Sequence, residues 1–279
     1  ISILVLAAAL CSGCSTAPFK TTDSFASYYA KNKEEVGSDL KGMASDLAVL
    51  SDSEATDPNY QSNDYADLLI NDSTNEVLES YHCFDRLYPA SITKVMTALL
   101  TLEHGNMDDE ITLKHDINLT ENGAVISTLT KGDTVTVGQV FHTMLIKSAN
   151  DCAVILAEYV AGSESKFIDM MNAKAKELGA THTHFVNPNG LHDNNHYTTA
   201  YDLYLIFKEA VKYDTFVDTV SSKDYTMTYT TPKKTQINEY MQSTNYYLLN
   251  EFPVPEGVVM YGGKTGTTSM AKSCLILMT

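Results

Sequence analysis

Residues 95–102 are apolar on nearly every side when they are wound as a helix, and this limits how the chain can fold. The apolar positions are Val95, Met96, Ala98, Leu99, Leu100 and Leu102. A helix that is apolar all round has no face suited to water, so other elements must surround it. Pro89 before it and Gly105 after it mark its ends. With 279 residues, 44% of them hydrophobic, the chain is long enough to build the core that such a helix needs.

The elements predicted around this helix indicate an α+β fold. Strand-like runs at residues 65–70 and 77–81 enclose turn-forming residues, so we expect a β-hairpin before the helix. Further helices are predicted at residues 138–147, 151–161, 164–178 and 199–213. Strands are predicted at residues 224–230 and from 258 to the end. This order suggests a sheet layer closed by both ends of the chain, with a mostly helical insertion.

The N-terminal part of the sequence is expected to direct export. Residues 1–10 are apolar but too few to span a bilayer, which needs about 20, and they suit the core of a signal peptide. Ser12, Gly13 and Cys14 resemble the end of a bacterial lipobox, in which Cys14 would be lipidated. An ordinary cleaved signal with an incidental cysteine is the alternative. Residues 15–64 are polar and predict a tether, part of which can form a spacer helix.

Composition excludes some classes of partner. The formal net charge is −16, and no long basic run is present, so nucleic acid is a poor candidate. An anionic ligand would need lysines that act locally. Outside the leader, Cys83, Cys152 and Cys274 match no zinc motif and no disulfide framework, and we expect no cofactor.

Ser91 and Lys94 are the first candidate catalytic pair, in an S-x-x-K pattern. The surrounding sequence favours this pair, because Ser91 lies two residues after Pro89 and opens the apolar helix. Residues three apart on a helix share a face, with Cβ atoms roughly 5–6 Å apart. Lysine acts as a base only when neutral, and burial can lower its pKa enough for that. The same pattern recurs at Ser38/Lys41, Ser163/Lys166 and Ser269/Lys272.

Two further motifs supply polar groups. Lys264, Thr265 and Gly266 form the K-T-G of the chain, and a strand edge there would offer Lys264 and the hydroxyls of Thr265 and Thr267 to a carboxylate. A solvated lysine at a glycine turn is the alternative. Ser148 and Asn150 form an S-x-N element in a loop between two predicted helices. Residues 73–75 and 243–245 share that pattern.

Together and in this order, the motifs resemble those of β-lactamases and penicillin-binding proteins. Residues 88–99, 184–191 and 196–203 are similar to segments of the low-molecular-mass D-alanyl-D-alanine carboxypeptidases. The resemblance covers residues 65–279 and implies a transpeptidase-like α+β fold, with an antiparallel sheet flanked by helices and a mostly helical subdomain. The family's further strand and closing helix are absent after the strand near Lys272, so we expect a C-terminally truncated catalytic domain.

The resemblance also implies roles for the motif residues. Ser91 would be acylated, Lys94 would take its proton, and Ser148 would relay a proton to the leaving D-alanine. Asn150 would orient the substrate amide.

Lys264 with Thr265 or Thr267, in the strand that carries Gly266, would hold the substrate carboxylate. The backbone N–H groups of Ser91 and Thr267 would form an oxyanion hole. The implied partners are peptidoglycan stem peptides ending in D-Ala-D-Ala and inhibitory β-lactams. The enzyme would act outside the cytoplasm, anchored to the outer face of the cytoplasmic membrane by lipid.

Three alternatives remain open at this point. A β-lactamase of the commonest class would need the glutamate of an E-x-x-L-N element, but Tyr246 stands at that place before Leu249 and Asn250, and Ala149 replaces the aspartate of S-D-N. A lipoprotein that binds cell-wall peptides or β-lactams without turnover would use the same residues. A metalloenzyme could be built from His182, His184, His192 and His196.

Overall fold

The computed structural model describes residues 47, 48, 50, 65–119, 121 and 123–279. The chain divides into two compact units, Ile1–Tyr81 and His82–Thr279. The predicted leader with Cys14 lies outside the described residues, as does nearly all of the predicted tether. Within the described part, no helix is both long enough and apolar enough to cross a membrane.

The described part of the first unit contains the predicted hairpin. Strand β1 (Asp67–Asn71) pairs antiparallel with β2 (Glu76–Tyr81). The Asn71 side chain closes the turn, because its Oδ1 accepts hydrogen bonds from the backbone N–H groups of Ser73 and Thr74 at 3.1 and 3.3 Å. Asn75 adopts a positive φ of 56°, which asparagine tolerates better than most residues. The turn composition seen in the sequence thus sets the hairpin.

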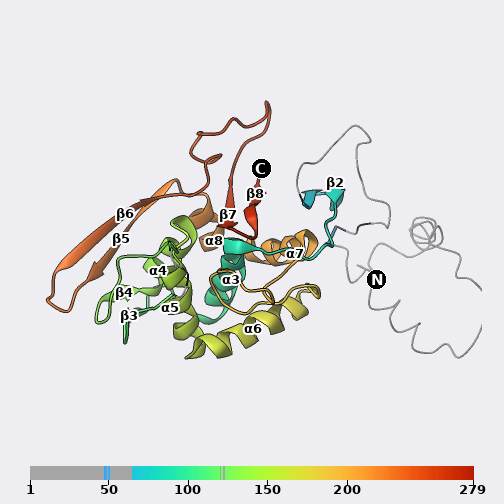
Figure 1. The fold of residues 1–279 in the computed structure, drawn as a ribbon. Helices are drawn as coiled ribbons and strands as arrows, with labels where there is room; N and C mark the ends of the chain where they lie inside the picture. The colour runs from blue at the N-terminus through green and yellow to red at the C-terminus, as the bar shows by residue number, and fades with distance from the viewer. Residues whose placement is uncertain (1–46, 49, 51–64, 120, 122) are drawn as a thin grey trace, which may run out of the picture. The chain divides into compact units, whose positions relative to one another are not determined.

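The second unit is built around helix α3 (Lys94–His104), as the apolar pattern predicts. Every side chain from Lys94 to Thr101 is buried, and Gly105 ends the helix. Four helices pack against α3 (Figure 1): α4 (Val137–Ile146), α5 (Asn150–Ala161), α6 (Glu164–Glu177) and α7 (Ala200–Ala210).

Ser91 does not lie in an α-helical turn as expected. It lies in a short 3₁₀ helix, η1 (Ala90–Thr93), directly before α3. Ala90 has a positive φ of 47°, so the right-handed α-helix cannot extend back through it. The chain tightens into i→i+3 bonding instead, with Ile92 N–H donating to Pro89 O at 3.2 Å.

The later helices agree with the sequence except at one break. The helix predicted at residues 199–213 ends at Ala210, and a separate helix α8 (Asp214–Val220) follows. Tyr213 between them is extended, which interrupts the helical hydrogen bonding. No glycine or proline marks this break, so residue patterns did not reveal it.

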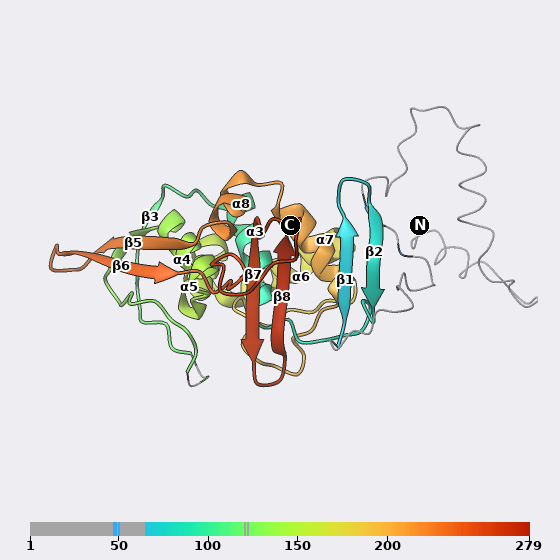
Figure 2. The same cartoon turned by 90° about the horizontal axis from the view of Figure 1, so that it is seen from above.

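The strands of the described residues form three hydrogen-bonded antiparallel sheets. Besides β1–β2, there is a four-stranded sheet and a two-stranded one, β7–β8 (Figure 2). In the four-stranded sheet the order is β3 (Glu110–Thr112), β4 (Thr134–Thr136), β5 (Asp224–Thr230) and β6 (Gln236–Gln242). Of these only β5 is predicted, because β3 and β4 are three residues long and β6 is largely polar. The α+β class with antiparallel strands is confirmed.

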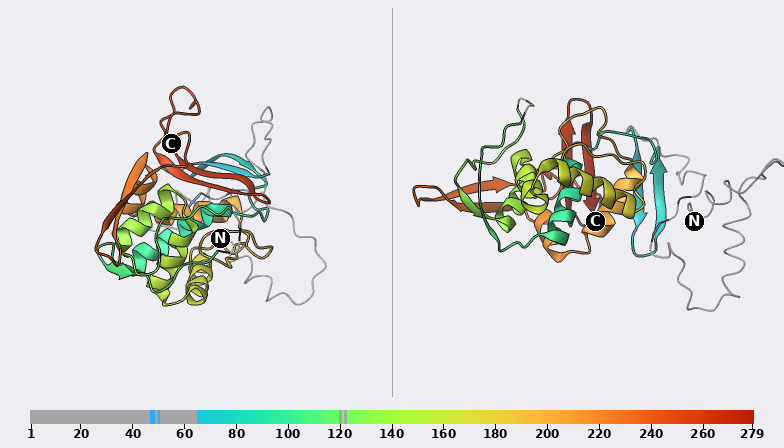
Figure 3. Two further views of the ribbon diagram at one scale, coloured as in Figure 1. Left: turned by 60° about the vertical axis from the view of Figure 1, so that its left-hand side comes forward. Right: turned by 90° about the horizontal axis from the view of Figure 1, so that it is seen from below.

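Strand β7 (Gly262–Thr268) brings the K-T-G motif against Ser91. It pairs with β8 (Lys272–Met278) and packs against η1, and the helices of this unit gather on one side of the pair (Figure 3). A Cβ added at Gly266 would lie 2.9 Å from Ser91 N and 3.1 Å from Ala90 Cβ. Real Cβ atoms are not found so close to a backbone nitrogen, so a glycine is needed at this crossing.

The loop before α7 approaches η1 from another segment. Gly190 has a φ of +84°, and a Cβ there would lie 1.9 Å from Ala90 O. The backbone of residue 190 therefore lies directly against the carbonyl that precedes Ser91.

We predict that Gly190→Ala is much more destabilising than Gly162→Ala, its matched control. Gly162 also has a positive φ (+77°), but a Cβ there meets nothing within 4 Å. Gly162→Ala should lower the free energy of unfolding by roughly 1–2 kcal/mol for the left-handed conformation alone. Gly190→Ala should lose about 1–3 kcal/mol more through overpacking. Urea unfolding followed by circular dichroism measures both, and equal losses would contradict the close contact.

Candidate active site

Lys94 lies at the centre of the candidate site, which falls wholly within the second unit. Its side chain is fully buried. The Nζ atom donates hydrogen bonds to Ser91 Oγ at 2.8 Å, Asn150 Oδ1 at 2.8 Å and the Asn189 carbonyl at 2.6 Å. An ammonium carries three N–H donors, so each donor has an acceptor. The acceptors come from η1, from the first turn of α5 and from the loop before α7.

The surroundings of Lys94 favour its neutral form. Burial lowers the pKa of Lys94 well below its usual value, and the nearby charge of Lys264 lowers it further. Cys152 and Asp151 act in the opposite direction, with smaller effects. A neutral amine 2.8 Å from a serine hydroxyl can accept its proton, so the pair is arranged for nucleophilic attack by Ser91.

A second buried lysine lies beside Ser148. Lys264 is 1% exposed, so it is not a solvated lysine at a turn. Its Nζ donates to Ser148 Oγ at 3.0 Å and to the Thr265 carbonyl at 2.7 Å. Burial lowers the pKa of Lys264 to about 7. Ser148 joins α4 to α5 with a positive φ of 63°.

The orientation of Asn150 is fixed by a segment that the sequence did not indicate. Val125 O accepts hydrogen bonds from Asn150 Nδ2 at 2.9 Å and from Asn150 N at 2.8 Å. These bonds leave Asn150 Oδ1 facing Lys94. Two residues further on, Ser127 donates to the Asp151 carboxylate from its backbone N–H and its hydroxyl, at 2.9 and 2.5 Å. Residues 125–127 are therefore held against the first turn of α5.

The two threonines of the β7 motif differ in availability. Thr265 Oγ1 lies 2.5 Å from Thr244 Oγ1, so that hydroxyl already has a partner. Thr267 is exposed. Thr244 belongs to the second copy of the S-x-N pattern at residues 243–245, which therefore supports the β7 strand. The copy at residues 73–75 lies in the β1–β2 turn.

The structure thus brings together the three motifs, from positions far apart in the sequence. Lys94 bonds Ser91 and Asn150, Lys264 bonds Ser148, and Gly266 packs against Ser91. The other S-x-x-K serines in the described chain lie elsewhere: Ser163 caps α6, and Ser269 lies in the β7–β8 turn. Ser38 and Lys41 lie outside the described residues.

The Asn189 carbonyl is the contact to Lys94 that sequence reasoning missed. The residue belongs to the segment at residues 184–191 that carries the family resemblance, but a backbone oxygen has no sequence signature. Asn187 shapes this loop, accepting from Gly190 N at 2.7 Å and donating to Leu191 O at 2.9 Å. Asparagine and glycine in close sequence favour a turn here, and this is the one local signal that the segment carries.

Three of the four histidines of the metal alternative are engaged in other contacts. His196 uses both ring nitrogens, with Nε2 2.8 Å from Thr93 Oγ1 and Nδ1 accepting from Val186 N at 3.2 Å. His184 Nδ1 lies 2.6 Å from Asn195 O, and His192 packs edge-on against Tyr88. In the part of the chain that the structure describes, no three His, Cys, Asp or Glu side chains are placed to hold a metal ion.

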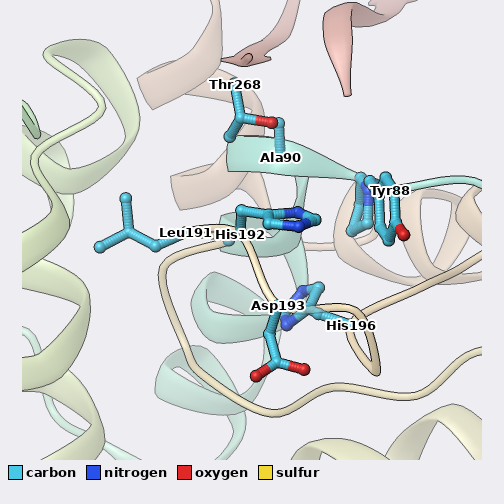
Figure 4. Close-up of a pocket in the computed structure, with 9 residues that line it drawn as sticks. Tyr88, Ala90, Leu191, His192, Asp193, His196 and Thr268 are labelled. Carbon is cyan, nitrogen blue, oxygen red and sulfur yellow. The ribbon is translucent and has the colours of Figure 1, made fainter. Parts of the chain in front are cut away.

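His192, Asp193 and His196 instead line a small pocket, together with Tyr88 and Ala90 (Figure 4). Neither Ser91 nor Lys94 is among the residues that line it.

Comparison with known proteins gives one consistent family. A family model described as D-alanyl-D-alanine carboxypeptidase, Peptidase S11, matches residues 51–279. The D-alanyl-D-alanine carboxypeptidase DacF of Bacillus subtilis is 35% identical over 212 residues, which are 75% of this chain and 52% of that protein. The chain thus spans about half the length of that relative. The crystal structure of a Streptomyces DD-transpeptidase matches with a TM-score of 0.68 and 29% identity, over 75% of this chain and 82% of that one.

We predict that burial of Lys264 makes stability depend on pH. Its pKa is about 7 in the folded chain and about 10.4 when unperturbed, so between these values the unfolded chain holds more protons. The free energy of unfolding therefore rises with pH above about 7. Between pH 7 and 9, the free energy of unfolding of wild type should increase relative to that of Lys264→Met by up to about 1.4 kcal/mol per pH unit.

Urea unfolding of both proteins at each pH measures this difference. Cys152 is present in both proteins and is not influenced by Lys264, so its own titration largely cancels in the subtraction. Lys94 does not cancel fully, because Lys264→Met removes a charge that lowers the pKa of Lys94. A difference between the two proteins that stays constant with pH would mean that Lys264 keeps an ordinary pKa in the folded chain.

Proposed function

The chain belongs to the D-alanyl-D-alanine carboxypeptidase family, and on this premise we propose that it is a serine D,D-carboxypeptidase. It removes the terminal D-alanine from peptidoglycan stem peptides through an acyl-enzyme on Ser91, and β-lactams inhibit it by acylating the same residue. One observation carries the proposal: a fully buried Lys94, with a lowered pKa, lies 2.8 Å from Ser91 Oγ.

In the acylation step, Ser91 Oγ attacks the carbonyl carbon of the penultimate D-alanine while neutral Lys94 takes the hydroxyl proton. The peptide bond then breaks, and the leaving D-alanine nitrogen needs a proton. Ser148 relays it: its hydroxyl gives a proton to the nitrogen and takes up the one that Lys94 received from Ser91, while Lys264 is hydrogen-bonded to Ser148 Oγ at 3.0 Å. The backbone N–H groups of Ser91 and Thr267 stabilise the oxyanion.

Asn150 and Lys264 recognise the substrate. The Asn150 amide, fixed by the Val125 carbonyl, orients the substrate amide beside Lys94. Lys264, with Thr267 or Thr265, holds the terminal carboxylate. The pKa of Lys264 is about 7 in the empty site, and an anionic substrate would raise it, because an opposite charge favours the protonated lysine. The protonated Lys264 then offsets the electrostatic repulsion between an anionic peptide and a chain of net charge −16.

Water must then hydrolyse the acyl-enzyme. A β-lactamase would hydrolyse the penicillin acyl-enzyme rapidly. In the commonest class of β-lactamases this step uses the glutamate of an E-x-x-L-N element, and here Tyr246 stands at that position. Tyr246 packs against Phe252 and is about half exposed, so it belongs to a surface aromatic contact. A non-catalytic binding protein would form the adduct and release no D-alanine.

We also propose that the protein works in the cell envelope, outside the cytoplasm. The apolar leader and Cys14 support export and a lipid anchor at the outer face of the cytoplasmic membrane. Mass spectrometry of the full-length protein made in a lipoprotein-processing bacterium tests this. A diacylated Cys14 is expected, and an N-terminus cleaved elsewhere without lipid would refute the anchor.

We predict that labelled penicillin forms a covalent adduct on Ser91 and that wild type releases D-alanine from a D-Ala-D-Ala peptide. Ser91→Ala should lose both. Ser163→Ala is the matched control, since Ser163 also precedes a lysine by three residues but caps α6, and it should keep both. Full labelling of Ser91→Ala would remove the assignment. Labelling of wild type without D-alanine release would favour the binding protein.

We predict that Lys264→Gln discriminates between substrates. The glutamine keeps much of the length but loses the ammonium, which should weaken the carboxylate contact by roughly 1.5–3 kcal/mol, about 10- to 150-fold in kcat/KM. A peptide amidated at its C-terminus lacks the charge, so wild type should use it poorly. Lys264→Gln should therefore lower kcat/KM for that peptide only slightly. Equal losses on both peptides would show that Lys264 acts through Lys94 instead.

A further inference from the structure

The residue before Ser91 is held in an unfavourable backbone conformation. Ala90 has a φ of 47° and is buried, with 2% of its surface exposed. An L-residue with a side chain resists this left-handed region, and such strain persists only where neighbours enforce it. Because Ser91 follows directly, any relaxation at Ala90 would move the nucleophile relative to Lys94.

A chain of hydrogen bonds ends on the Ala90 carbonyl. Val186 N–H donates to His196 Nδ1 at 3.2 Å, so that nitrogen carries no proton. The proton of the neutral ring is then on Nε2, which donates to Thr93 Oγ1 at 2.8 Å. The Thr93 hydroxyl donates in turn to Ala90 O at 2.8 Å. A backbone donor at one end and a backbone acceptor at the other fix the direction of every bond.

The surroundings of Thr93 and His196 protect these hydrogen bonds from water. Thr93 and His196 are 1% and 2% exposed, so water does not compete freely for their polar atoms. Burial lowers the pKa of His196 to about 4, which keeps the ring neutral near pH 7; Asp193 opposes this effect, and His184, Lys94 and His192 add to it. Gly190 closes over the same carbonyl. Figure 4 shows that His196 and Ala90 come from separate elements.

We infer that Thr93 and His196 are positioning residues: their hydrogen bonds hold Ala90 in the left-handed conformation that places Ser91 Oγ beside Lys94. The inference rests on the proposed function, because it concerns how fast Ser91 is acylated. Neither residue touches the reacting atoms through the bonds described. Thr93 acts on Ser91 through the Ala90 carbonyl, and His196 acts through Thr93.

The test combines Thr93→Val with Ala90→Gly and measures the second-order rate constant for acylation by labelled penicillin. Thr93→Val keeps the side-chain shape and removes the hydroxyl, and we expect acylation to slow by roughly 5- to 30-fold. Thr93→Ser, which keeps the hydroxyl, should stay within about 3-fold of wild type. Glycine adopts a positive φ without strain, so in the Ala90→Gly background the loss from Thr93→Val should shrink to about 3-fold or less.

Thr101→Val is the matched control on the same helix. Thr101 is also fully buried and donates to a backbone carbonyl, that of Thr97, at 2.7 Å. It should lose stability in urea unfolding and keep the wild-type acylation rate. The inference is overturned, and Thr93 is structural only, in either of two cases. One is that Thr93→Val keeps the wild-type acylation rate as Thr101→Val does. The other is that Thr93→Val slows acylation equally with Ala90 and with Ala90→Gly.

A second measurement does not need turnover. If wild type is not labelled by penicillin, the proposed function fails, and the ¹³C carbonyl shift of Ala90 tests the positioning directly. We expect this shift to change in Thr93→Val and in His196→Gln and to stay unchanged in Thr101→Val. An unchanged Ala90 shift in Thr93→Val would overturn the inference whatever the reaction is.

Discussion

The site depends on keeping one lysine out of water without giving it an anionic partner. Lys94 is fully buried, and its three acceptors are a hydroxyl, an amide oxygen and a backbone carbonyl. All three are neutral groups, so they stabilise the positive charge less than a carboxylate would. Burial can therefore lower the pKa. The apolar surface of α3 and the four helices around it supply that burial, which links the packing of the core directly to the availability of a base.

The hydrogen-bond partners of Asp151 also favour a neutral Lys94. This buried carboxylate follows Asn150 directly, and its charge tends to raise the pKa of Lys94. Its oxygens, however, accept hydrogen bonds from the backbone and hydroxyl of Ser127. A direct ion pair with Lys94 would have stabilised the ammonium and removed the base. The hydrogen bonds from Ser127 to Asp151 hold residues 125–127 against Asn150 in the first turn of α5. They also occupy the carboxylate, which limits its effect on the pKa of Lys94.

Sequence reasoning succeeded where the physical signal is local. The all-round apolar pattern of residues 95–102 predicted the central helix, and the spacing of Ser91 and Lys94 predicted their contact. It failed where the partner is a backbone carbonyl, as with Asn189 O and Val125 O, because every residue has one. It also missed β6, whose polar residues gain order from pairing with β5, and the 3₁₀ turn at Ser91, which follows from the φ of Ala90. These features arise from tertiary packing rather than from residue preference.

Backbone strain lies at both serines of the site, and its placement explains how they are aimed. Ser148 itself has a φ of 63°, and Ala90 beside Ser91 has a φ of 47°. The first lets the chain turn sharply between α4 and α5, so that the hydroxyl meets Lys264. The second lies at the first residue of η1, against which Gly266 and Gly190 pack from two separate segments. Because strained conformations relax unless several contacts oppose them, the close backbone packing of these glycines is part of what keeps the nucleophile in place.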